Sequence, residues 1–214
     1  MHRTSLIIAL ASCTFAAQAN AQLFYVSQER SVSARTDDSI QTFASDATGL
    51  FDDSASSSFP EGSAFASATQ TSTLGLGSIV AFGDTAAGAL NAFVANSSTV
   101  LDVTFDLAGP SAFTFEGVLS FVDVNDARIT LFEESGDEIF RVGFQPNGID
   151  FVGSLSTSGT LDAGRYRLLA TGVADNGSVF DPAGGFDFSF SVVPAPGTGA
   201  LFACSIFMTR RRRA

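Results

Sequence analysis

The side chains that could do chemistry in this chain are carboxylates, and they occur in short clusters. The stretch Asp123-Val124-Asn125-Asp126 places three side-chain oxygen donors in one expected turn, and Ca²⁺ prefers such ligands. It lacks the glycine and the terminal glutamate of an EF-hand loop, so the candidate metal ligands are Asp123, Asn125 and Asp126 alone. Calcium is the one cofactor that the sequence suggests. The simpler alternative, which we favour, is that the acids cap turns and keep strand edges soluble.

The remaining acidic clusters suggest a second chemistry, glycoside hydrolysis by paired carboxylates. Such an enzyme also needs a sugar-binding cleft, which is usually lined by Trp and His. Residues 22–193 contain no His, Cys, Trp or Lys. This composition excludes Ser-His-Asp and Cys-His nucleophiles, lysine Schiff bases and the usual zinc and copper ligands. We therefore expect a protein that is not an enzyme. The paired acids are Asp52–Asp53, Glu133–Glu134 and Asp137–Glu138.

The charge balance of the chain excludes nucleic acid as a partner. Residues 22–193 hold all 22 acidic residues and only six arginines, and subtracting the former from the latter leaves a charge of −16. A surface of that sign repels phosphate backbones. It favours solubility and the binding of cations.

An alternation of apolar and polar residues indicates β-strands along most of the chain. Val103, Phe105 and Leu107 alternate with polar neighbours, which is the period of a strand buried on one face. Turn signals such as Gly109-Pro110-Ser111 separate such runs. The pattern predicts an all-β antiparallel sandwich or jelly roll. Within residues 22–77, which are rich in Ser, Ala and Thr, it favours long, weak strands, and the alanines of 85–95 permit one short helix.

The N-terminus has the three parts of a secretion signal. A basic start is followed by the apolar run Leu6–Ala17, and small residues at Ala19 and Ala21 form an A-x-A cleavage site for signal peptidase. This predicts a signal helix within residues 1–21. The rest of the chain is then exported.

The C-terminus has the parts of a short membrane segment. Pro194-Ala195-Pro196-Gly197 breaks the preceding structure, and the apolar run Thr198–Thr209 precedes four arginines. A helix over this run covers roughly 20 Å of a hydrocarbon layer about 30 Å thick, which suits transient anchoring in the inner membrane. The arginines are expected to stay in the cytoplasm.

This tail resembles the PEP-CTERM sorting signal, which combines a Pro-x-Pro motif, a hydrophobic segment and a terminal arginine cluster. Ala195 replaces the usual glutamate between the prolines. The resemblance implies that an exosortase-like enzyme recognises the last two dozen residues and sorts the protein to the cell surface. The motif residues are Pro194, Pro196, Gly197, Arg210, Arg211, Arg212 and Arg213.

The stretch Leu161–Leu168 resembles the Leu-x-x-Gly-x-Tyr pattern of pre-peptidase C-terminal domains, where it enters a late strand. The likeness extends over Val100–Val192. It implies a jelly-roll-like accessory domain without catalytic function.

Together these features predict four segments: a signal peptide (1–21), a Ser/Ala/Thr-rich β region (22–98), a β-sandwich core (99–193) that forms one domain with it, and a sorting tail (194–214) with a short hydrophobic helix. The function expected is a structural or adhesive one at the cell surface or outside the cell, within an extracellular polysaccharide matrix. The alternative is a calcium-assisted carbohydrate-binding module.

Overall fold

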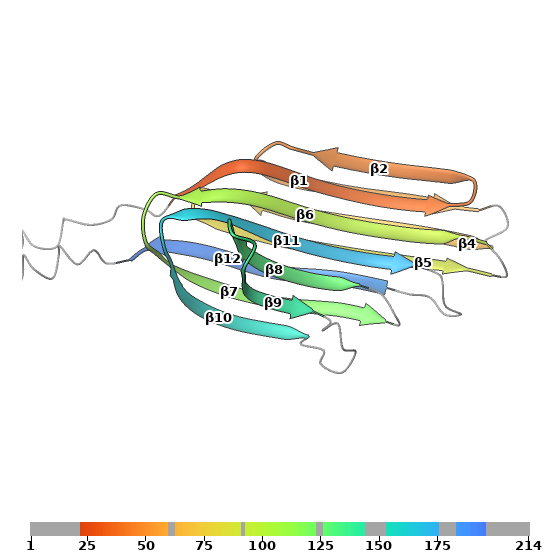
Figure 1. The fold of residues 1–214 in the computed structure, drawn as a ribbon. Coiled ribbons are helices and arrows are strands. Elements are labelled where there is room, and N and C mark those ends of the chain that lie inside the picture. Colours follow the sequence, from red (N-terminus) through yellow and green to blue (C-terminus); the bar gives the residue numbers. More distant parts are fainter. Residues whose placement is uncertain are drawn as a thin grey trace, which may run out of the picture.

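The computed structural model describes residues 22–59, 63–90, 93–122, 126–143, 153–175 and 183–195. These residues form twelve strands in two six-stranded antiparallel sheets, and the described part contains no helix (Figure 1). The predicted all-β class is confirmed. The expected signal helix lies outside the described residues, and so does the tail beyond Ala195. In the described part we find no helix long and apolar enough to cross a membrane.

Sheet A has the strand order β2-β1-β6-β11-β8-β9. Its alternating strand directions follow from the antiparallel pairing of all neighbours. Two β-bulges interrupt its register, one in β1 between Tyr25 and Ser27 and one where β8 meets β9. Its strands are β1 (Leu23–Thr36), β2 (Ser39–Ser45), β6 (Ala95–Leu107), β8 (Ala127–Glu133), β9 (Glu138–Gly143) and β11 (Gly164–Asp175).

Sheet B has the order β10-β7-β12-β5-β4-β3 and is also fully antiparallel. Both described ends of the chain lie at the same end of the molecule, beside the turn that joins β4 to β5. There the N–H of Leu23 donates to the carbonyl of Leu76, and the N–H of Val192 donates to that of Gly77. The strands of sheet B are β3 (Gly49–Ser58), β4 (Ala64–Leu74), β5 (Ser78–Ala89), β7 (Ser111–Val122), β10 (Ser154–Leu161) and β12 (Ala183–Pro194).

The two sheets pack face to face as a β-sandwich. Strand β1 lies over β3 and β4, β6 lies over β4 and β5, and β11 lies over β5 and β12. Strands from residues 22–98 and from residues 99–193 occur in both sheets, so the two segments share one pair of layers.

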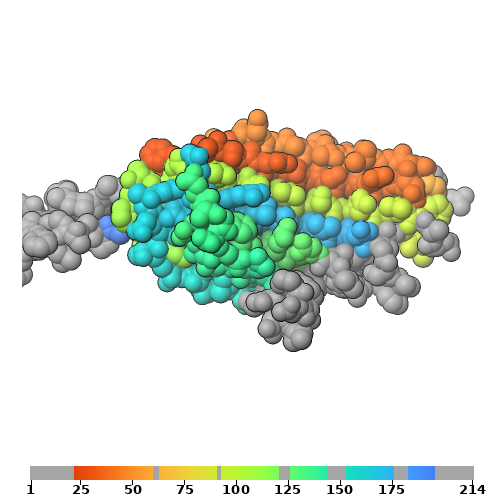
Figure 2. All heavy atoms as spheres, in the orientation of Figure 1, coloured from red at the N-terminus to blue at the C-terminus, as the bar shows by residue number. Residues whose placement is uncertain are grey.

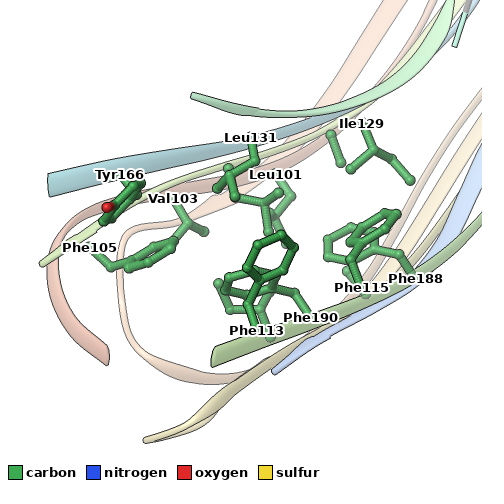
Figure 3. Close-up of a cluster of buried hydrophobic side chains, with 14 of the residues drawn as sticks. Leu101, Val103, Phe105, Phe113, Phe115, Ile129, Leu131, Tyr166, Phe188 and Phe190 are labelled. Atoms are coloured by element: carbon green, nitrogen blue, oxygen red, sulfur yellow. The ribbon is translucent and has the colours of Figure 1, made fainter. Parts of the chain in front are cut away.

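One end of the sandwich is filled with phenylalanine. Inward residues of β6, β7 and β12 alternate with exposed or partly buried ones, as the sequence pattern predicts, and their rings contact one another (Figure 3). The ring centres of Phe115 and Phe140 are 4.4 Å apart, and those of Phe113 and Phe190 are 6.0 Å apart. Such pairs add to the free energy gained by burying their area. Of the 15 phenylalanines whose side chains the structure describes, seven are buried and three more pack against the cores, so most of them serve as core.

The other end is filled mainly with alanine, and here the sheets come very close together. Ala64, Ala66 and Ala68 of β4 face this second core. Near it, a Cβ added to Gly172 of β11 would lie 3.0 Å from the carbonyl oxygen of Gly184 in β12, so backbone meets backbone across the sandwich. Small side chains are what this spacing allows. The strands predicted for residues 22–77 are confirmed, and three of the four that lie there are ten residues long or more.

The short helix that the alanines of 85–95 would permit does not form in the described part of this segment. Residues 85–89 complete β5, and Ala95 begins β6. The reason is burial at alternate positions: Thr85 and Ala87 face the interior while Asp84 is exposed. Alanine suits this segment because the facing sheet is near, and this tertiary constraint outweighs its helix propensity.

Buried polar groups separate the two cores. The amide of Gln70, oriented to satisfy its neighbours, donates to the carbonyls of Ser31 (3.1 Å) and Val100 (3.0 Å). The fully buried Arg30 donates to the carbonyl of Gly49 at 2.8 Å and to that of Ala47. Its guanidinium lies 5.4 Å from the ring centre of Phe51, and burial lowers its pKa. Arg30 thus ties the crossing from β2 to β3 to the interior.

Candidate functional site

Of the three predicted calcium ligands, only Asp126 belongs to the described residues. Its side chain is exposed and lies 3.8 Å from Nε of Arg128. Asp123 and Asn125 lie outside the described residues. Among the residues that are described, no three acidic, His or Cys side chains come together as a metal site. The calcium site stays a prediction.

The paired acids are dispersed over the sandwich. Asp52 accepts a hydrogen bond from Thr71 on the outer face of sheet B (2.9 Å). Asp137 accepts one from the hydroxyl of Ser135 within the β8–β9 turn (2.9 Å), and Glu138 pairs with Arg141 at 2.5 Å. These contacts are those of turn and surface residues. Glu133 and Glu134 differ, because they line a groove.

The predicted processing residues are mostly beyond the described part. Pro194 is the last residue of β12, opposite Ser111, and the N–H of Ala195 donates to the carbonyl of Pro110 (3.1 Å). The chain therefore leaves the sheet at the expected proline. Ala19, Ala21, Pro196, Gly197 and the four arginines 210–213 lie outside the described residues.

The groove lies where the β8–β9 turn and the β10–β11 turn flank the start of β11. It consists of two adjoining hollows of about 440 Å³ and about 300 Å³. Figure 2 shows the green β8–β9 turn standing out beside the blue strand β11. The turn is closed by the N–H of Glu133 on the carbonyl of Asp137 (2.9 Å) and by Gly136 at a φ of 90°. The lining residues include Thr104, Phe132, Glu133, Glu134, Asp162, Arg165, Tyr166 and Arg167.

Two arginines in the groove are held rigidly by aspartates of the neighbouring strand. Arg165 donates from Nε and Nη2 to both oxygens of Asp106 (2.8 and 3.0 Å), and Arg167 does the same to Asp102 (2.8 and 2.5 Å). The antiparallel register of β6 and β11 sets Arg165 opposite Asp106 and Arg167 opposite Thr104. Neither pair of bonds uses the Nη1 donors. Nη1 of Arg165 lies 4.0 Å from Oε1 of Glu134, which leaves the Nη1 donors of Arg167 for another partner. The groove is thus lined by preorganised hydrogen-bond donors.

These ion pairs shift the titration of their members. The hydrogen bond from Arg165 lowers the pKa of the Asp106 carboxyl, and the same bond raises the pKa of Arg165. The hydrogen bond to Asp102 likewise raises the pKa of Arg167. These hydrogen bonds therefore favour the charged forms of Asp106, Arg165 and Arg167. Glu133 and Glu134, which also line the groove, add acidic side chains to it.

Tyr166 is a structural residue beneath the groove. Its hydroxyl donates to the carbonyl of Asp162 (3.0 Å), and its ring lies 5.9 Å from that of Phe105. Burial raises its pKa, and Glu133 and Asp162 add to that shift. Tyr166 lies near the start of β11, so the stretch Leu161–Leu168 enters a strand, as its resemblance implies.

Phe132 is the groove residue that sequence reasoning missed. Ile129 and Leu131 point into the core, so the next residue points outward, and Phe132 is half-buried beside Arg167, its partner in register. The alternation within β8 contained this signal. A flat ring beside two fixed guanidinium groups and two carboxylates can hold a polar, uncharged ligand.

Sheet B differs in charge from sheet A, which carries the groove. The six strands of sheet B hold five acids and no Lys or Arg. All six arginines between residues 22 and 193 lie in sheet A strands. Val80, Phe82 and Val118 are about half exposed on this acidic face.

The chain was also compared with known proteins. No protein-family model matches it, and no curated protein matches it either. The fold and the groove are therefore the basis of any functional conclusion.

Proposed function

We propose that this chain is a non-enzymatic, exported and surface-sorted β-sandwich protein with a structural or adhesive role in an extracellular polysaccharide matrix. The observation that carries the proposal is the groove beside β11, whose arginines are fixed by ion pairs and whose Phe132 offers a flat apolar face. Such a surface is suited to contact with a polymer. The terminal segments supply the export and sorting signals on which the location rests.

The fold is proposed to be an extended jelly roll. The orders β5-β12-β7-β10 and β6-β11-β8-β9 are those of eight strands wound as nested antiparallel pairs. Strands β1 to β4 then add two strands to each sheet. This agrees with the resemblance of residues 100–192 to jelly-roll accessory domains. An experimental structure with another strand order would contradict it.

The location is tested by expressing the full chain in a bacterium that has an exosortase, beside a variant with Arg210 to Arg213 changed to Ser. The parent chain should reach the cell surface, where protease added outside removes it, and the variant should be mislocalised. Equal surface exposure of the two would remove the sorting tail from the proposal. Retention of both in the cytoplasm would overturn export.

The second candidate is a calcium-assisted carbohydrate-binding module, and the groove favours it as well. Its test is binding of the full chain to immobilised polysaccharides in calcium and in chelator. Phe132→Ala should abolish binding, whereas Phe82→Ala, which removes a half-exposed ring from the opposite face, should not. Asp126→Asn should weaken binding only in calcium. Binding that survives Phe132→Ala would place the ligand elsewhere.

A further inference from the structure

We infer that β2 is a self-pairing edge, through which two copies of this chain join their A sheets around a two-fold axis. Strand β2 is the outermost strand of sheet A and lies at the free edge in Figure 1. Six of its seven residues are exposed. An unpaired strand edge is a template for another strand, and natural sheets normally protect it.

The other three edge strands are less suited to pairing. Strand β9 meets its neighbour through a bulge and carries Glu138 and Arg141. Strand β3 has two adjacent aspartates, of which Asp53 is turned partly inward. In addition, the backbone N–H of Ser56 in β3 already donates to the side-chain oxygen of Gln41 in β2 (2.7 Å). Strand β10 is uncharged but carries no exposed large apolar side chain. Strand β2 has no charge, proline or bulge, and it exposes two large apolar side chains.

The register of β2 fixes which backbone groups are available. A two-residue turn joins Thr36 to Ser39, which makes them the closing hydrogen-bonded pair of the β1–β2 hairpin. Because hydrogen-bonded pairs alternate along antiparallel strands, Ile40, Thr42 and Ala44 direct their N–H and C=O groups to the free edge. Three donors and three acceptors therefore form an evenly spaced, self-complementary row centred on Thr42.

A second copy of β2 fits this row better than an arbitrary strand. In antiparallel pairing about Thr42, the two threonines oppose each other, and Ile40 opposes Ala44 of the second copy on the same face. Phe43, which is 38% exposed, becomes a diagonal neighbour of its own copy on the other face. Ile40 is 67% exposed in the single chain, so pairing covers both apolar side chains of the strand.

The residues that flank β2 oppose the pairing electrostatically. The same register sets Asp38 against Asp46 of the second copy at both ends of the joined strands. Like charges placed opposite one another disfavour strand pairing, and acids flanking an apolar strand limit its association. Self-pairing should therefore strengthen as salt screens these carboxylates. The extent of pairing therefore depends on ionic strength.

The test uses cysteine cross-linking in the full chain, since Cys13 and Cys204 can be replaced by Ser and no other cysteine exists. Opposed residues of a hydrogen-bonded pair have Cα atoms about 5.5 Å apart, within the range of a disulfide. Thr42→Cys should give a disulfide dimer under oxidising conditions. Ser189→Cys, exposed on the central strand β12, is the matched control and should stay monomeric.

Two further experiments test the register of the paired strands and the effect of the flanking aspartates. Ile40→Cys and Ala44→Cys should cross-link strongly only when the two variants are mixed. Asp38→Asn with Asp46→Asn should raise the yield of the Thr42→Cys dimer by up to about fivefold for each like-charge pair removed. Cross-linking of Ser189→Cys to the same extent as Thr42→Cys would show random collision and overturn the inference. A dimer with no preference for the mixed pair would also overturn the proposed register.

Discussion

Replacing Arg30 by methionine tests whether a buried cation that donates to backbone carbonyls stabilises this fold. The change keeps most of the side-chain volume but removes the hydrogen bonds to the carbonyls of Ala47 and Gly49 and a long one of 3.5 Å to the carbonyl of Ser72. Hydrogen bonds from a charged donor contribute about 1.5–3 kcal/mol each, so loss of the two short bonds amounts to about 3–6 kcal/mol. Removing a buried Nε that has no hydrogen-bond partner in the described part returns about 1–3 kcal/mol. We expect Arg30→Met to lower the free energy of unfolding by about 3 kcal/mol.

The assay is urea unfolding of the full chain, followed by circular dichroism at neutral pH. Arg35→Met is the matched control, because Arg35 lies on the same strand but is exposed. It should change the free energy of unfolding by less than about 0.5 kcal/mol. Hydrogen exchange adds a local readout: the crossing around residues 46–49 should lose protection first in Arg30→Met. If Arg30→Met is as stable as the parent or more stable, desolvation of the charge outweighs its hydrogen bonds and the reasoning is wrong.

Three further predictions concern the turn, the sheet spacing and acid stability. Tyr166→Phe removes the hydrogen bond to the turn before β11 and should cost about 1 kcal/mol in unfolding free energy; no change in denaturant midpoint would contradict this. Gly172→Ala forces a Cβ against β12 and should lower the free energy of unfolding by about 1–3 kcal/mol. In the control Gly109→Ala the added Cβ meets nothing within 4 Å, so the free energy should fall by less than about 0.5 kcal/mol. Similar melting temperatures of the two variants would refute the close contact between the sheets. Arg165 lowers the pKa of Asp106 below its usual 3.8, so the pair stabilises the fold above that pH and loses this contribution as pH falls through the lowered pKa. Asp106→Asn should therefore flatten the dependence of the melting temperature on pH below about pH 4, and parallel curves for the two proteins would disprove this.

The fold class could be predicted because alternation is a local property of the sequence. Val103, Phe105 and Leu107 face inward as their spacing indicates, and Gly109-Pro110 ends the strand where a turn was expected. The stretch Leu161–Leu168 also leads into a strand, β11, as its resemblance implies. Features set by two or three consecutive residues were therefore readable without the structure.

What could not be predicted depends on pairing across the sheets. The alanines of residues 85–95 are compatible with a helix until the nearness of the facing sheet is known. Arg30 gives no sign in the sequence of being buried, because its partners are backbone carbonyls of another segment. The groove is likewise non-local, since it joins Phe132 of β8 to Arg165 and Arg167 of β11. The alternation around Ile129 and Leu131 indicates that Phe132 points outward, but not what lies beside it.

The uneven placement of the arginines gives the sandwich an electric dipole across its layers. The strands of sheet A hold six arginines and six acids, while those of sheet B hold five acids and no arginine. In the field of an anionic polymer or surface, the charges of the strands alone would produce a torque that turns sheet A toward the negative charge and sheet B away from it. The strand charges therefore favour one orientation of the sandwich beside an acidic polymer, although the chain is acidic overall.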